Sequence, residues 1–413
     1  MFNTLSNSGF LFGAFVLALI QVAAAIPWLF SLEAKGFRES ALDRQRWINI
    51  GYGAGIAFIG LAVLLAYDGA SKQINWYGRL YGIVLHIQIL ADVLIWLPHI
   101  LAFFLPKTGA VALAAYRESW RQPMFWLIAL GGLIATWIAV VLPYFTFGDD
   151  YKMFKLIGFD IIMLASLLFG AIAASISVSE EIEGRTAITV MSKPISRRSF
   201  LVGKFLGIVL ACFGLAMILT INLNFALLAN REFDQINYDR SVDRMAEQAK
   251  DAVLPLVSKA FPTAPLEEFA KWAATWLAEC YTHGLGVLFC FGQVTILVAI
   301  AVAIATRLHF IVSLLVVLFV YLAGHLAPVI SKVTESRGGG GSANVVVGFL
   351  AKVFDVLMPS LEYYNMGPAV VRDTPLDLGQ FALYALTVSG YSALYTAIAL
   401  IVGLLLFDDR DLA

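Results

Sequence analysis

Residues 282–330 decide the class of fold, and they read THGLGVLFCFGQVTILVAIAVAIATRLHFIVSLLVVLFVYLAGHLAPVI. The stretch holds two apolar runs, 282–306 and 309–330, and its single Lys, Arg, Asp or Glu is Arg307. A helix needs about 20 apolar residues to cross the hydrocarbon core of a bilayer. Each run is long enough, so the stretch predicts two membrane-spanning helices joined by a short turn at Arg307.

Seven further runs of this kind precede and follow that pair: 8–31, 48–67, 80–105, 124–146, 156–177, 201–228 and 388–407. The 413 residues are 60% hydrophobic and 14% charged, against about 45–50% and 25% in soluble domains. We therefore predict an all-α polytopic membrane protein with about nine transmembrane helices. The first run is followed by small residues, as in a signal peptide, but lacks a positive leading segment, so we expect it to be retained.

The distribution of Lys and Arg predicts the orientation, because short cytoplasmic loops are enriched in both. With the N-terminus outside and the C-terminus inside, the inner segments and adjoining span starts hold fourteen basic residues, and the short outer segments hold four. We expect this orientation, N-out and C-in.

Two longer segments fall outside in this arrangement. Residues 229–281 contain nine acids and six bases, with apolar residues at helical spacing, and predict a cap of two or three short helices separated by Pro255, Pro262 and Pro265. Residues 331–387 include a glycine run at 338–341 followed by Ser342, which fits either an engineered linker or a natural loop. The apolar stretch 345–357 is too short to span, and we expect a re-entrant or interfacial helix there.

Motifs for catalysis are missing from the sequence. It has no GxxxxGK[ST], HExxH or GxSxG pattern, so we expect no ATP site in this chain, no metal site and no catalytic residues. The net charge of −1 excludes a general field for nucleic acid. Cys212, Cys280 and Cys290 have no metal-ligand spacing.

A few polar residues interrupt the apolar runs, where they are costly. Asp92 lies in the middle of the third run, and is either a relay for protons or ions or a polar contact between helices. Asn222 and Asn224 flank Leu223. We expect them to hold neighbouring helices together, and the alternative is a substrate site.

The most specific signal lies between the fifth and sixth runs, where 180–204 reads EEIEGRTAITVMSKPISRRSFLVGK. Gly184 and Pro194 bound a short helix at the membrane surface, and Ser196 is placed to cap the next helix. This segment is much longer than a simple hairpin turn requires.

The pattern of this segment resembles that of ABC-2 type transporter permeases. Residues 116–126, YRESWRQPMFW, resemble the elbow helix of that family and the start of the span that follows, and the end LFDDRDL at 406–412 resembles its closing segment. The resemblance covers about residues 110–413. Residues 1–105 depart from the six-span pattern of the family, which does not explain the role of the three additional spans there. We expect the rest of the chain to divide into an elbow, three spans and a coupling segment (106–228, with coupling at 178–200), the cap (229–281) and three last spans (282–413).

The resemblance implies a permease that dimerises in a bacterial inner membrane and exports an amphipathic or polymeric substrate, with ATP and Mg²⁺ bound by a separate ATPase subunit. The residues implied to couple to that ATPase are Glu181, Glu183, Gly184, Arg185, Thr186, Lys193, Pro194 and Arg197. The implied elbow contacts are Tyr116, Arg117, Trp120 and Arg121. Two alternatives stay open: ATP-driven force on an extracytoplasmic partner through the cap, and ion-coupled transport through Asp92.

Overall fold

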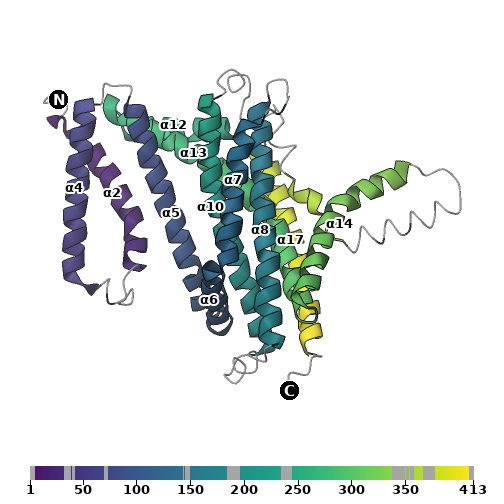
Figure 1. The fold of residues 1–413 in the computed structure, drawn as a ribbon. Helices are drawn as coiled ribbons and strands as arrows, with labels where there is room; N and C mark the ends of the chain where they lie inside the picture. The colour runs from purple at the N-terminus through teal and green to yellow at the C-terminus, as the bar shows by residue number, and fades with distance from the viewer. Residues whose placement is uncertain are drawn as a thin grey trace. The chain divides into compact units, whose positions relative to one another are not determined.

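The computed structural model describes residues 5–31, 39, 42–68, 73–142, 144, 149–183, 196–233, 244–336, 349, 353, 358–365 and 377–408. Every regular element in these ranges is a helix (Figure 1). Eight of the described helices are long and apolar enough to cross a membrane. They correspond to eight of the nine predicted runs, and the ninth run forms α14 (Phe310–Ser336), with an apolar part at Phe310–Leu326. The chain is an all-α polytopic membrane protein.

The chain divides into two compact units, residues 1–97 with 243–283 and residues 98–242 with 284–413. The first unit contains α2 (Ser8–Ser31), α4 (Arg44–Asp68), most of α5 (Ile74–Phe104), α12 (Arg244–Ala260) and the first half of α13 (Ala264–Ala305). Its core joins residues of four of these helices: Phe10, Ala14, Leu17, Ala62, Leu65, Ala66, Ile74, Leu266 and Phe269.

Polar contacts also join α2 to α5 in the first unit. The Tyr81 hydroxyl donates to the Leu17 carbonyl at 2.7 Å, and the Gln21 amide donates to the Gln88 amide oxygen at 2.5 Å. Both pairs advance in the same direction along the two helices, so α2 and α5 run parallel. Such bonds are favourable inside a membrane, where water is not available as a partner.

The second unit contains α6 (Pro106–Arg121), α7 (Pro123–Val141), α8 (Asp150–Glu183), α10 (Arg197–Phe233), the second half of α13, α14, the short 3₁₀ helix η1 (Leu361–Tyr364) and α17 (Leu378–Asp408). The most apolar window of α8 is 72% buried and that of α10 is 61% buried, against 28% for α7 and 22% for α17. The window of α13 is 67% buried, and Val294, Ile296 and Leu297 in its second half are fully buried. α8, α10 and the second half of α13 therefore form the centre of this unit, and α7 and α17 lie at its edge.

The helices of the predicted cap differ from the expectation. Pro255 lies inside α12 and does not end it, and Pro265 is the second residue of α13, a position where the missing N–H costs nothing. Only the break around Pro262 was predicted correctly. α13 then continues for 42 residues without interruption, so the second cap helix and the following span are one helix. The glycine run at 338–341 with Ser342, and the segment 345–357 apart from residues 349 and 353, lie outside the described residues.

Candidate functional site

The predicted coupling segment, 178–200, includes the last turns of α8, which ends at Glu183, and the first turn of α10, which begins at Arg197. Glu181 and Glu183 lie in the last turn of α8, and their side chains are outside the described part of the chain. So are the residues Gly184, Arg185, Thr186, Lys193 and Pro194. Ser196 caps α10 as predicted, because its hydroxyl accepts a hydrogen bond from the Ser199 N–H at 3.1 Å. The structure therefore describes the helices that hold this segment at both ends.

The elbow helix α6 packs along the first turns of α10. It is longer than the predicted elbow at 116–122, and Pro123 ends it by starting α7. The contact depends on three glycines of α10 at 203, 207 and 214, which share one helix face. A Cβ on Gly203 would lie 2.6 Å from Val111 Cβ, and a Cβ on Gly214 would lie 2.6 Å from Trp120 Cζ2. Small residues at this spacing allow two helices to approach closely inside a membrane.

Lys204 joins three helices next to this contact. It lies on α10 and is only 5% exposed. Its ammonium donates to the Ser177 hydroxyl of α8 at 2.8 Å and lies 3.4 Å from the Glu118 carboxylate of α6. A buried charge is stable only when it is paired and hydrogen-bonded. Lys204 therefore ties the elbow helix to both helices that border the coupling segment.

Aromatic rings fill the corner between α6 and α7. The Trp120 ring lies 4.6 Å from the Phe125 ring and 5.9 Å from the Tyr116 ring, and the Trp126 indole N–H donates to the Trp120 carbonyl. Burial raises the pKa of the Tyr116 phenol above its usual value, so this group stays neutral at physiological pH. Arg117 is exposed, with Nη2 3.5 Å from His99 Nε2, and Arg121 is exposed as well.

The first residue of α10 also binds the end of α17. Arg197 Nη1 donates to the carbonyls of Phe407 and Asp408, each at 2.9 Å. Arg307, which follows α13, donates from Nε to the Leu406 carbonyl at 2.7 Å. Cations at a helix C-terminus satisfy its free carbonyls and its dipole. Three helices of the second unit are thus joined at the end from which the coupling segment extends.

The intramembrane polar residues have different surroundings. The Asn222 oxygen accepts a hydrogen bond from the Trp137 indole of α7 at 3.0 Å, so Asn222 joins two helices. Asn224 is buried on α10. Asp92 is half-buried in the first unit, and its Oδ1 is a buried atom with no hydrogen-bond partner among the described residues.

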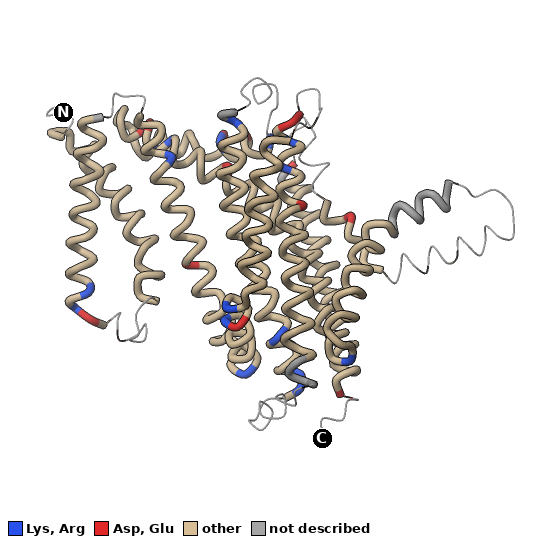
Figure 2. Tube along the Cα trace, in the orientation of Figure 1, with Lys and Arg blue, Asp and Glu red and all other residues tan. Residues whose placement is uncertain are grey.

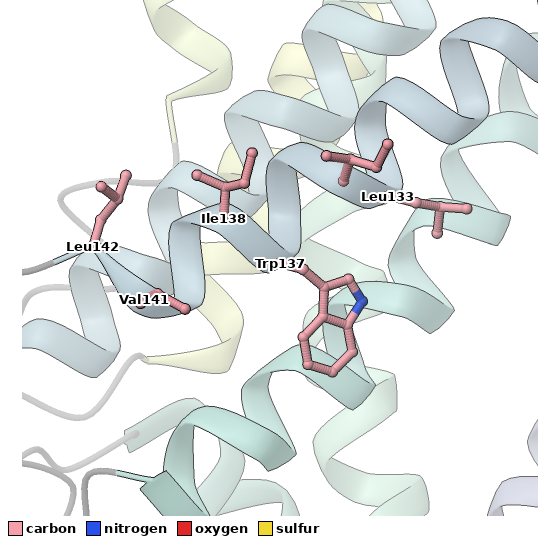
Figure 3. A pocket seen from close by; sticks show the side chains of 6 residues that line it. Leu133, Trp137, Ile138, Val141 and Leu142 are labelled. Carbon is pink, nitrogen blue, oxygen red and sulfur yellow. The ribbon is translucent and has the colours of Figure 1, made fainter.

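Trp137 lines an apolar groove on α7 with a volume of about 550 Å³ (Figure 3). Its lining residues are Leu133, Ile134, Trp137, Ile138, Val141 and Leu142. None of them is charged, so the chemistry of this groove suits a hydrocarbon chain.

Lys and Arg of the second unit lie around α6 and the start of α10, and others lie at the opposite end, at the start of α8 and the end of α10 (Figure 2). The group around α6 is at the end of the unit at which the coupling segment lies. Within the described ranges, no three His, Cys, Asp or Glu side chains lie close enough together to hold a metal ion.

A model of the ABC-2 family transporter proteins matches residues 114–412. The chain belongs to the ABC-2 transporter family. The match begins inside α6 and includes every residue named in this subsection except Asp92, His99 and Val111. It confirms the family expected from the motifs at 116–126, 180–204 and 406–412. No curated protein and no solved structure matches the chain.

This ABC-2 family member is therefore a permease subunit, a multi-pass membrane protein of a transport system. The motifs did not reveal the roles of Lys204, Glu118, Ser177 and Arg307. The spacing of Gly203 and Gly207, four residues apart at the start of a span, is a signal of close helix packing. It does not identify α6 as the helix that packs there, because α6 is remote in sequence.

Proposed function

We propose that this permease is the membrane-spanning part of an ATP-driven exporter, and that a separate ATPase acts on it through residues 181–197. The supporting observation is the frame around that segment. α8 leads into it, α10 leads out of it, and Lys204 links both helices to α6. If a partner displaced the segment, α6, α8 and α10 would move together.

The ATPase would bind ATP and Mg²⁺, and two copies of the permease would form the transport path. Export of an amphipathic or polymeric substrate fits the apolar groove on α7, whose lining has no charged side chain. The exposed Arg117 and Arg121 of α6 would provide a second contact for the ATPase. The site of action would be a bacterial inner membrane.

Co-purification tests this proposal. The tagged chain is purified from its native host in mild detergent, and the proteins retained with it are identified by mass spectrometry. We expect a P-loop ATPase with the wild type and its loss with the double variant Glu183→Ala and Arg185→Ala.

The matched control changes the same two residue types elsewhere, Arg244→Ala with Glu247→Ala. These two side chains form an ion pair at 3.3 Å on α12, far along the chain from the coupling segment. The ATPase should stay bound to this variant. Retention of the ATPase by the coupling variant would contradict docking at 181–197, and its absence from the wild type would contradict the exporter itself.

A second candidate function is force transmission to an extracytoplasmic protein. It is favoured by the continuity of α13, which joins residues of the cap to a span without a break over 42 residues. The same purification tests it, because such a protein would be retained by the wild type and lost after deletion of residues 244–260.

A further inference from the structure

The helix α12 has two chemically distinct sides. At 100° per residue, one arc contains Arg244, Glu247, Gln248, Asp251 and Lys259. The opposite arc is apolar except for Lys250, whose ammonium pairs with the Glu279 carboxylate of α13. Part of the apolar arc packs inside the first unit, including Leu254 and Val257, which are half-buried. The rest of it is uncovered: Leu256 is 67% exposed, Val253 is 38% exposed, and Ala260 is exposed.

The end of α12 lies at the level of the first turns of the spans. Phe261, directly after α12, and Leu266 of α13 lie against Gly13 of α2. Gly13 is five residues from the start of α2, which is about 7–8 Å along a helix. Phe269 contacts Gly78, four residues into α5. The turn between α12 and α13 therefore packs against the first turns of α2 and α5 and does not project away from them.

Aromatic and cationic side chains lie close together near the start of α5. The Arg79 guanidinium lies over the rings of Trp76 and Trp272, at 5.3 and 5.0 Å from their centroids. Trp76 is 53% exposed. Tryptophan and arginine in this arrangement are typical of the membrane–water interface. The start of α5 is thus at the membrane surface, and the end of α12 is within one or two turns of it.

We propose that α12 lies in the membrane surface, with Val253, Leu256 and Ala260 in contact with lipid acyl chains. The leaflet is the one in which α2 and α5 begin, the outer leaflet in the predicted orientation. The charged arc faces water, because burying it would cost far more than burying the apolar arc gains. A helix of this kind lies with its apolar face about 5–10 Å into the boundary between headgroups and acyl chains.

Fluorescence quenching tests the contact with lipid. The full chain with Leu256→Cys is labelled with an environment-sensitive dye and reconstituted into vesicles of phosphatidylcholine and phosphatidylglycerol. The native cysteines at 212, 280 and 290 are buried. The protein without the added cysteine is treated with the same dye, and its fluorescence is subtracted as background. We expect a blue-shifted emission that is lost when the vesicles contain nitroxide-labelled acyl chains and is retained with aqueous iodide.

The matched control is Asp251→Cys on the polar arc of the same helix, whose dye should be quenched by iodide and not by the lipid nitroxide. A second probe at Val253→Cys repeats the test if the Leu256 variant does not fold, as judged by its elution as a single species. Quenching of the probes at 253 and 256 by iodide would overturn the proposal. Protection from both quenchers would overturn it too, because the arc would then be covered by protein.

Discussion

Lys204 links the elbow helix α6 to α8 and α10, the two helices that border the coupling segment. Its ammonium is buried and lies within 3.4 Å of oxygens from two other helices. Hydrogen bonds to charged groups contribute about 1.5–3 kcal/mol each. We therefore expect Lys204 to stabilise the packing of α6 and α8 against α10. Lys204 reaches Glu118 only while α6 stays close to α10. The pairing therefore depends on Gly203 and Gly207, which allow this close approach.

Gly207 should be intolerant of any side chain. A Cβ there would overlap the Ala112 carbonyl oxygen and lie 2.7 Å from the Ala115 Cβ. We expect Gly207→Ala to lower the thermal midpoint of the purified protein in detergent, because overpacking costs about 1–3 kcal/mol.

Gly131→Ala on α7 is the control, since nothing lies within 4 Å of its Cβ position and alanine favours helix. It should leave the midpoint unchanged or raise it slightly. Equal midpoints for the two variants would mean that α6 does not pack against this face of α10.

Asp92 distinguishes ATP-driven from ion-coupled transport. We expect Asp92→Asn to leave both the ATP turnover and the transport of the reconstituted permease–ATPase complex unchanged, with or without a proton gradient. The reason is that Asp92 lies in the first unit, outside the region that matches the family. Loss of gradient-dependent transport with normal ATP turnover would instead identify Asp92 as a relay.

At the scale of elements, the end of α17 depends on two arginines from other helices. Its last three carbonyls, at Leu406, Phe407 and Asp408, all accept hydrogen bonds from Arg307 or Arg197. Removing these donors leaves the final turn of α17 without partners for its carbonyls and weakens its contact with α10 and α13.

The variant Arg197→Gln should therefore increase hydrogen exchange at the amides of the last turn of α17. Arg198→Gln is the matched control, because Arg198 is the neighbouring arginine and is exposed. Equal exchange in the two variants would show that the bonds from Arg197 do not hold the end of α17.

For the whole molecule, the number of spans and their orientation can be measured together. Lys107 precedes three predicted spans and Lys259 follows them, so these two positions should lie on opposite sides of the membrane. Three more spans, including α14, separate Lys259 from Asp408. All three positions are exposed and can be replaced by cysteine one at a time.

A membrane-impermeant thiol reagent added to intact cells should label Lys259→Cys and should label Lys107→Cys and Asp408→Cys only after permeabilisation. The reverse pattern would invert the orientation. Labelling of Asp408→Cys together with Lys259→Cys in intact cells would show that α14 does not span.

The sequence alone determined the class of fold, the positions of the spans and the family. Apolar runs of about 20 residues have few alternatives to a membrane helix, and the motifs at 116–126, 180–204 and 406–412 are local patterns. The cap of Ser196 on α10 was predictable for the same reason, because the capping hydrogen bond joins residues only three positions apart.

Only the tertiary structure decided which helices meet. The pairing of α6 with the glycines of α10, the position of Lys204 between Glu118 and Ser177, and the arginines on α17 all join residues that are remote in sequence. Apolar periodicity does not identify a partner, because lipid and a neighbouring helix are equally apolar. The continuity of α12 through Pro255 was missed for a related reason: proline weakens a helix locally, and packing of the helix against its neighbours can outweigh that cost.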